Sequence, residues 1–414
     1  MTTTHSKLDS PSAADRTEAC PGSVALTMYL PDERSVHSDA GTLCHWLSAM
    51  FLSGELTCEP SEYLTLFPQG GHQCPDVSPD MLITQDMCDI AQYYVDYVRR
   101  EAEGADLFYV EARVAMNASL CVESGAEGTA DCIIFFPGLV KVIDLKAGFT
   151  PVDPNTSQLK RYALGARETF SHMLDGTEVF KLAIVQPKLD FIGEIELTWE
   201  ELDGYQHIAA ASASDVRTAI EQRDDAQLTD EQWEKWWLNP GEKQCRWCKA
   251  KAWCPALAKA SMETIEDVPP KDMEAEALGV AMAKVGMVED WCKAVRAAVE
   301  GALIQGRQVP GFKLVQGRRG PRAWSDEAEA ERLMKEKFRL KNEDMYEFKL
   351  FSPTKAEKVL GEQPKRWAQL EKLIVQSDGK PSVAPESDKR PALSMAPSAD
   401  GMEEIVETAD DLVG

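Results

Sequence analysis

Two aspartates and a lysine lie close together in the stretch GTADCIIFFPGLVKVIDLKAG, residues 128–148. Both halves are apolar and β-branched and meet at Pro137-Gly138, so they predict two strands of a hairpin. Side chains alternate along a strand, so Asp144 and Lys146 share a face, and Asp131 can meet them across the hairpin. Two carboxylates suit Mg²⁺ or Mn²⁺, beside a lysine that orients a water or stabilises phosphate charge.

A structural interpretation of the same residues is also open. The pattern Asp/Glu-x-Lys occurs at Asp144-Lys146, Glu347-Lys349 and Asp378-Lys380, so the pattern alone carries little weight. Only the first match closes an apolar strand that follows a second strand bearing an aspartate. Charges at such a place are costly to bury unless they are paired or hold a metal. A catalytic site and a structural ion pair therefore remain alternatives.

Two further side-chain groups fit a catalytic site. Gln158 and Tyr162 are four residues apart and share one face of a helix predicted over 156–170, with Thr156 or Ser157 as its N-cap. His45, in GTLCHWL on an earlier predicted helix, could supply a nitrogen ligand, although a single helical histidine is more often packed or solvated.

Three cysteines form a second cluster in QCRWCKAKAWC, residues 244–254. Cys245, Cys248 and Cys254, the last followed by Pro255, suit a [4Fe–4S] cluster, which takes four cysteines. Zn²⁺ is the alternative, although structural zinc sites usually use two close pairs and no second pair exists here. A redox pair is disfavoured because no βαβ context surrounds it.

The elements that must position these residues alternate in type. Helices are predicted within 38–55 and over 81–103, strands over 106–116, 128–138 and 139–148, a helix over 156–170 and a strand over 179–189. Beyond the cysteines, helices are predicted over 273–304 and onward to about 375. The order α, β-β-β, α, β predicts a mixed α/β fold.

Composition limits the class of protein. The 414 residues are enough for two or three domains, and 44% hydrophobic with 27% charged residues is ordinary for a soluble protein. No run is long and apolar enough to span a bilayer, and the N-terminal residues lack the core of a signal peptide, so we expect the cytoplasm. Eleven cysteines in such a chain are not expected to form a disulfide framework.

The net charge of −25 is unfavourable for a nucleic-acid partner overall. One basic groove would be enough, however, and KLVQGRRGPR, residues 313–322, has four basic residues and no acid, which suits phosphate contacts or a solvated loop. Five tryptophans near the cysteines are expected to pack as a small core, with base stacking by one of them as the alternative: Trp233, Trp236, Trp237, Trp247 and Trp253.

The motifs GTLCHWL, GTAD, VIDLKAG and QLKRYALGA, in this order, resemble the His, Asp, Asp/Glu-x-Lys and Gln-x-x-x-Tyr motifs of RecB-like PD-(D/E)XK nucleases. The likeness covers about residues 20–255. ACPGSVAL and VPGFKLVQGRRGPRAW further resemble a phage-borne group of such proteins. The resemblance implies a restriction-endonuclease-like core, in which a mixed sheet is flanked by helices.

The implied activity is a Mg²⁺- or Mn²⁺-dependent deoxyribonuclease, acting as an exonuclease on DNA ends or single strands in phage DNA replication or recombination. The resemblance makes His45, Asp131, Asp144 and the Leu145 carbonyl the metal ligands. Lys146 would position the attacking water, with Gln158 and Tyr162 as an accessory pair. Asp144 stands where many relatives have Glu. The alternative is a catalytically silent module that binds DNA or a partner on the same fold.

Iron–sulfur nucleases of this family, the AddB and CRISPR-associated types, have one cysteine before the nuclease core and three after it. The resemblance therefore makes Cys20, in ACPGS, the fourth ligand of a structural [4Fe–4S] cluster, with Zn²⁺ at the four cysteines as the alternative.

Three regions are expected along the chain: a nuclease domain over 1–262, a mainly helical domain with the basic turn over 263–375, and an acidic disordered tail over 376–414. The tail is rich in Pro, Ser and acidic residues and has almost no aromatic residue, so it cannot bury much apolar area. It would be repelled by DNA and is a candidate contact for a replication or recombination protein.

Overall fold

A computed structural model describes residues 8–31, 35–68, 72–78, 80–224, 227–266 and 275–313, together with 332 and 335–336. The chain divides into two compact units, 1–316 and 317–414, and nearly all described residues belong to the first. Its elements are α1 (Ala14–Ala19), α2 (Gly22–Thr27), α3 (Val36–Leu52), α4 (Tyr63–Leu66), α5 (Gln85–Glu101), β1 (Leu107–Ala115), β2 (Glu127–Phe136), β3 (Leu139–Leu145), α6 (Ser157–Thr169), β4 (Val179–Gln186), β5 (Phe191–Thr198), α7 (Trp199–Glu221), α8 (Asp230–Trp237), α9 (Glu242–Arg246), α10 (Pro255–Glu266) and α11 (Ala275–Ile304).

The five strands form one mixed sheet in the order β1-β2-β3-β4-β5. β3 and β4 are parallel and are joined through α6, while the other neighbours are antiparallel. The predicted hairpin is present: Phe136 pairs with Leu139 across a turn in which Gly138 has φ +79°, a conformation that glycine adopts without strain. Strand β5 and the long helix α7 were not predicted, although FIGEIELT alternates as an edge strand should.

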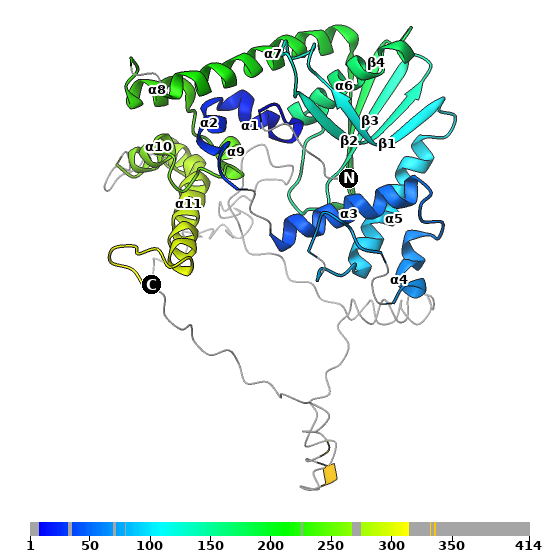
Figure 1. Ribbon diagram of the computed structural model, residues 1–414, viewed down its shortest axis with the longest axis horizontal. Helices are drawn as coiled ribbons and strands as arrows, with labels where there is room; N and C mark the ends of the chain where they lie inside the picture. The colour runs from blue at the N-terminus through cyan, green and yellow to red at the C-terminus, as the bar shows by residue number, and fades with distance from the viewer. Residues whose placement is uncertain are drawn as a thin grey trace, which may run out of the picture. The chain divides into compact units, whose positions relative to one another are not determined.

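Helices cover both faces of the sheet (Figure 1). On one face, α3 and α5 pack against β2, β3 and β4. The core on this face includes Leu47 of α3, Tyr94 of α5 and Ile143 of β3. On the other face, α6 and α7 pack with residues such as Val142 and Phe180. The predicted α/β fold with a helix-flanked mixed sheet is confirmed.

Local sequence fixes the start of α6, the helix that carries Gln158 and Tyr162. Thr156 is the N-cap, and its hydroxyl accepts a 3.3 Å hydrogen bond from the Leu159 N–H. The cap satisfies one backbone donor that has no partner within the helix. Of the two predicted caps, Thr156 is therefore correct.

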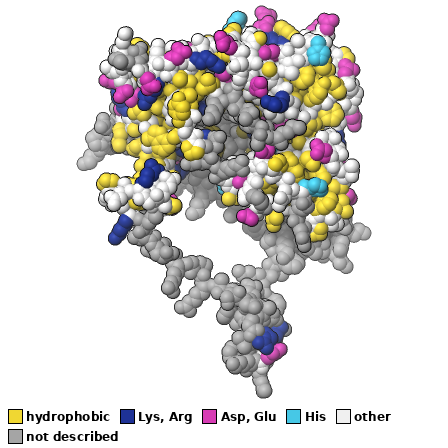
Figure 2. Space-filling view, viewed as in Figure 1, with side chains coloured by type: hydrophobic (Ala, Val, Ile, Leu, Met, Phe, Trp, Pro, Cys, Tyr) yellow, Lys and Arg dark blue, Asp and Glu magenta, His cyan; other side chains and the backbone are white. Residues whose placement is uncertain are grey.

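The region after the cysteines contains two helices, α10 and α11, and residues 305–313 are not helical. α10 and α11 include exposed apolar side chains such as Met262, Leu278 and Val280, and Figure 2 shows hydrophobic side chains exposed over this part of the molecule. No helix among the described residues is both long and apolar enough to cross a membrane. The predicted helices after residue 313, the basic turn beyond Lys313 and the acidic tail lie outside the described residues, and the predicted domain boundaries stay predictions.

A buried lysine joins the central strand β3 to the edge strand β5 and to helix α5. Lys141, on β3, is 2% exposed, and its Nζ donates to Glu101 and, at 2.7 Å, to Glu194 Oε1. Glu194, on β5, also accepts from Tyr97 OH at 2.6 Å and contacts Lys181 Nζ at 2.7 Å. Burial alone would raise the pKa of Glu194, but these donors outweigh it and lower the pKa to about 2.

Replacing this carboxylate should remove an acid-sensitive part of the stability. The pKa of Glu194 is lowered by folding, so its contribution is present above pH ~4.5 and is lost as the pH falls toward 2. Glu194→Gln should lower the free energy of unfolding by about 1–2 kcal/mol at pH 7, after allowance for solvent screening of a partly exposed group.

Urea unfolding of both proteins at pH 7 and at pH 3 measures this effect. The difference between them should shrink at pH 3, and a difference that stays constant with pH would contradict the assignment. Glu196→Gln, two residues further along β5 and exposed, is the matched control.

Candidate functional site

The two predicted aspartates lie where β2 and β3 separate. The last paired residues of these strands are Cys132 and Ile143, and the next positions are Asp131 and Asp144. Asp131 Oδ2 accepts a 2.7 Å hydrogen bond from the Leu145 N–H. The carboxylate thus satisfies a backbone donor at the point where the strands diverge.

Lys146 is held by two side chains of the predicted site. Its Nζ lies 2.8 Å from Asp144 Oδ2 and donates to Gln158 Oε1 at 2.9 Å. Gln158 Nε2 in turn contacts Asp144 Oδ1 at 3.2 Å and Tyr162 OH at 3.3 Å. Leu145 points into the core on the opposite face, as strand alternation requires. The structure therefore brings four predicted residues into one hydrogen-bonded network.

His45 reaches the site from α3, on the opposite face of the sheet from α6. Its Nδ1 lies 3.1 Å from Asp131 Oδ1. The surrounding protein disfavours a charged imidazole, but the charge and hydrogen bond of Asp131, with Asp144 further away, raise the pKa of His45 to about 9. Although burial opposes it, the same pairing with His45 lowers the pKa of Asp131. In the metal-free protein the two groups thus form an ion pair at neutral pH.

Glu111 belongs to the site and was missed by the sequence analysis. It lies on β1, where Val110 pairs with Cys132 and Ala112 with Ala130, so its register position is beside Asp131. Its φ of +49° is rare for a residue with a side chain, which marks a local distortion of the strand. Desolvation, with the Asp131 charge adding to it, raises the pKa of Glu111 to about 7. FYVEARV contains no motif that would have identified this residue.

The arrangement is suited to a divalent cation. Among the described residues, His45, Glu111 and Asp131 are the one set of three or more possible metal-binding side chains whose ligand atoms all lie within 4.8 Å of one another. Imidazole and carboxylate together suit Mn²⁺ and, through the oxygens, Mg²⁺. Asp144 is not in this set, so its role and that of the Leu145 carbonyl as ligands stay predictions.

The buried carboxylate of Asp144 is also incompletely compensated by positive charge. The residue is 2% exposed, and its Oδ2 has the close Lys146 contact but no aligned hydrogen-bond donor. Burial raises the pKa of Asp144, and Lys146 only partly offsets this effect. An under-satisfied buried carboxylate beside other carboxylates is stabilised by a bound cation.

The N-terminal helix α1 packs directly against the start of α6. Asp15 Oδ1 accepts a 3.1 Å bond from the Ser157 N–H, and Glu18 accepts from the Ser157 hydroxyl. Glu18 Oε1 also contacts Arg161 Nη2 at 3.2 Å and accepts from Tyr205 OH at 2.8 Å. Arg161 is 1% exposed, so this ion pair is buried. α1 therefore fixes the turn of α6 that carries Gln158.

Pro11, shortly before α1, lies against Gly128, the first residue of the GTAD motif. A Cβ on Gly128 would lie 2.6 Å from Pro11 Cγ and 3.1 Å from Tyr162 Cε1. Only glycine leaves room for both neighbours at this position.

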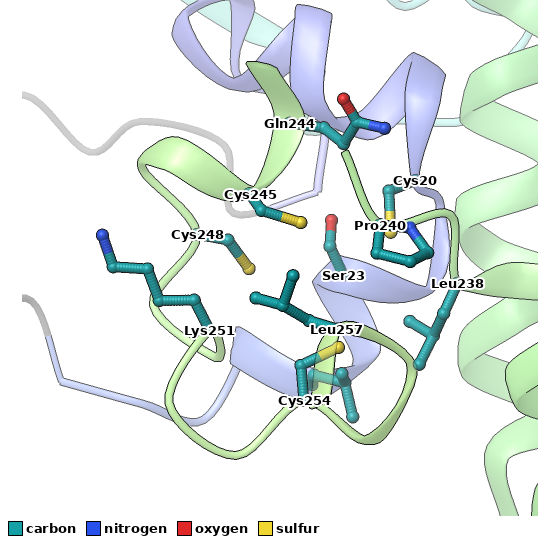
Figure 3. Close-up of a pocket in the computed structure, with 11 residues that line it drawn as sticks. Cys20, Ser23, Leu238, Pro240, Gln244, Cys245, Cys248, Lys251, Cys254 and Leu257 are labelled. Atoms are coloured by element: carbon teal, nitrogen blue, oxygen red, sulfur yellow. The ribbon is translucent and has the colours of Figure 1, made fainter. Parts of the chain in front are cut away.

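Cys20 follows α1 directly and lies in a hollow with the three later cysteines. Figure 3 shows the four thiol groups around this hollow, which Leu257 and Pro240 also line. Two backbone N–H groups point at sulfur: Asn239 N lies 3.3 Å from Cys20 Sγ, and Gly241 N lies 3.4 Å from Cys245 Sγ. Cys20 thus lines the same hollow as Cys245, which follows it by 225 positions, and the closer convergence of the four sulfurs stays a prediction.

The electrostatics of the hollow suit a metal group. Burial, with Cys248 adding to it, raises the pKa of Cys245 to about 11 and also raises the pKa of Cys20 and Cys254. Several thiolates cannot stay together here without a cation. N–H donors such as those of Asn239 and Gly241 stabilise thiolate sulfurs when a metal is bound.

The two candidate groups require different sulfur spacings. In a tetrahedral zinc site with Zn–S distances of ~2.3 Å, all four sulfurs lie less than ~4 Å apart. Within the described part of the chain, no three cysteine sulfurs lie within 4.8 Å of one another. An iron–sulfur cluster is larger than a single ion and separates its ligands more widely.

The five tryptophans divide into two groups. Trp233 is 1% exposed and Trp237 is partly buried, and both pack in the small core beside Cys20 and Cys254, as predicted. Three others do not: Trp236, Trp247 and Trp253 are 56%, 78% and 54% exposed. The prediction of a single tryptophan core is wrong for these three, because their side chains face solvent and not that core.

Comparison with known proteins gives one family match. The family model described as "Protein of unknown function (DUF2800)" matches residues 5–391. A solved structure described as "Crystal structure of SSO0001" is similar at 17% sequence identity and a TM-score of 0.24, over 57% of this chain and 95% of that one.

Binding of Mn²⁺ should release protons, because His45 must lose its proton to bind a metal. With the pKa of His45 at about 9 and that of Glu111 at about 7, affinity should rise about tenfold per pH unit from pH 7 to 9, and more steeply below pH 7. Isothermal titration in buffers of different ionisation enthalpy measures both the affinity and the protons released.

His45→Asn should weaken the dependence between pH 7 and 9, while His172→Asn, an exposed histidine on another part of the surface, should keep it. An unchanged slope in His45→Asn would show that this imidazole is not a ligand.

Proposed function

The chain belongs to the DUF2800 family, and we propose that it is a metal-dependent deoxyribonuclease that hydrolyses phosphodiester bonds with Mg²⁺ or Mn²⁺. The observation that carries the proposal is the network in which Lys146 is held between Asp144 and Gln158, beside the close set of His45, Glu111 and Asp131. The resemblance of the four motifs supports DNA as substrate and exonuclease action on ends or single strands, in phage DNA replication or recombination.

When bound, the cation supplies Lewis-acid chemistry at the phosphate and at the attacking water. Lys146 provides directed positive charge. Burial would lower the pKa of Lys146, but the contact with Asp144 outweighs this and raises it, so the ammonium group stays charged. A charged lysine donates hydrogen bonds and does not act as a base. Its role is therefore to orient the water and to stabilise charge on the phosphate oxygens.

The reaction transfers the phosphoryl group to water. The attacking water gives up a proton to bulk water and its oxygen forms a bond to phosphorus, the bond to the leaving deoxyribose oxygen breaks, and that oxygen takes a proton from bulk water. Gln158 holds the ammonium group of Lys146, and Tyr162, 5% exposed, contacts the other end of the amide. This pair positions the lysine, and α1 positions the pair through Ser157 and Arg161.

Asp144→Asn and Lys146→Gln should each lower the rate of DNA cleavage by about 10²–10⁴-fold while the protein stays folded, because each removes a charge from the reacting centre. Labelled linear and circular single strands, incubated with Mn²⁺ and with a chelator control, measure the reaction. An exonuclease degrades the linear strand and leaves the circular one intact.

Lys349→Gln, in the second Asp/Glu-x-Lys match, is the sequence-matched control and should cleave like the parent. Cleavage by Asp144→Asn or Lys146→Gln at the parental rate would remove the catalytic assignment. Absence of any metal-dependent cleavage by the parent would favour a silent binding module.

We further propose that Cys20, Cys245, Cys248 and Cys254 hold a structural [4Fe–4S] cluster. The support is the shared hollow and the two N–H groups directed at sulfur. Zn²⁺ is the alternative that the same four ligands allow. The group would join the residues before the sheet to those after it, and so add to the free energy of folding.

Protein purified without oxygen should be brown and should contain iron and acid-labile sulfide. Cys20→Ser should lose the colour and unfold at a lower temperature, because one ligand and the connection to α1 are removed. Cys121→Ser, at an exposed cysteine, is the control and should stay brown. A colourless parent that contains zinc would overturn the cluster.

A further inference from the structure

Two exposed tryptophans lie in the segment that holds the later cysteines. Trp247 lies between Cys245 and Cys248 and is 78% exposed, and Trp253, directly before Cys254, is 54% exposed. Tryptophan is mostly buried in folded proteins, where its large apolar surface leaves water. The buried Trp233 shows the ordinary arrangement, since its Nε1 donates to the Ala219 carbonyl at 2.8 Å.

The same segment is basic in an acidic protein. Residues 243–259 contain five basic residues and no acid, within a chain of net charge −25: Lys243, Arg246, Lys249, Lys251 and Lys259. The Arg246 guanidinium lies 5.5 Å from the centre of the Trp247 ring. Lys251 extends away from the hollow in Figure 3, and its Nζ donates to the Arg246 carbonyl at 2.8 Å. Positive charge and exposed aromatic rings thus alternate over one short stretch.

The cysteines and the small core fix the backbone that carries both rings. Cys248 and Cys254 are each 8% exposed, and Ala250 and Leu257 are buried between and beyond them. Cys254 N donates to the Ala250 carbonyl at 2.8 Å. Rings on a fixed backbone lose little conformational freedom when they bind a flat partner.

We propose that this segment, residues 243–259, binds single-stranded DNA, with Trp247 and Trp253 stacking on unpaired bases and the basic side chains contacting the phosphates. Unpaired strands present the faces of their bases, whereas a duplex conceals them. Charge complementarity favours a polyanion, because this stretch is positive where the chain as a whole is negative. The choice of DNA rests on the proposed function, and the surface would hold the strand that the catalytic site cleaves.

Binding is measured by the anisotropy of a labelled 20-nucleotide thymidine strand, and of a duplex of equal length, with Ca²⁺ in place of Mn²⁺. Trp247→Ala and Trp253→Ala should each weaken binding of the single strand by about tenfold, the lower part of the range for one lost stacking contact. Trp247→Phe should retain most of the affinity, because phenylalanine also stacks.

Trp236→Ala is the matched control: this tryptophan is 56% exposed but lies on α8, outside the basic segment. It should bind like the parent. The colour and melting temperature of each variant show whether the cysteine site is intact, and the quenching of tryptophan emission by DNA in Trp247→Phe and Trp253→Phe identifies the rings that are contacted.

The proposal is overturned if both alanine variants bind the single strand like the parent. It is also overturned if these variants lose affinity for the duplex by the same factor as for the single strand. It is also overturned if Trp236→Ala loses as much affinity as the others. Failure of the nuclease proposal is a separate result: a parent that binds the strand through Trp247 without cleaving it keeps the surface and removes the activity. A parent that cleaves DNA, with tryptophan variants that bind the single strand as the parent does, keeps the activity and removes the surface.

Discussion

The hydrogen bond from the Leu145 N–H to Asp131 Oδ2 is the constraint around which the site is built. At this point β2 and β3 stop pairing, and without the carboxylate a backbone donor next to the core would have no partner. The bond also fixes the direction of Asp131, whose other oxygen faces His45 from α3. Asp131 thus connects the end of the β2–β3 pairing to a helix on the far face of the sheet, and the close set of His45, Glu111 and Asp131 depends on that connection.

The sequence predicted the parts of the site that depend on strand periodicity and short motifs. Asp131, Asp144 and Lys146 converge because the hairpin turn at Pro137-Gly138 sets their register, and two-residue turns are recognisable in a sequence. Glu111 could not be predicted, because its place depends on the pairing of β1 and on a distorted backbone that no local pattern encodes. The mixed sheet was predictable, while its edge strand β5 was overlooked although its alternation was visible.

Tertiary packing decided what local patterns left open. Five tryptophans within 21 residues, 233–253, have similar sequence surroundings, yet two are packed and three are exposed. Their division depends on which side of the chain faces Cys20, more than two hundred residues earlier, and α7, which ends shortly before the first of them. The buried contact of Glu18 with Arg161 is of the same kind, since neither residue stands in a motif that would pair it with the other.

The meeting of Cys20 with Cys245 has a consequence for the order in which the protein is made. Synthesis proceeds from the N-terminus, so α1 leaves the ribosome long before the residues that complete its surroundings, and the sheet and α7 are made in between. The hollow can close only after the whole intervening domain has been synthesised and folded. A chain that stops early, or whose sheet misfolds, therefore lacks the four-cysteine hollow, and its first cysteine remains an accessible thiol. The site thus distinguishes a finished domain from an incomplete one.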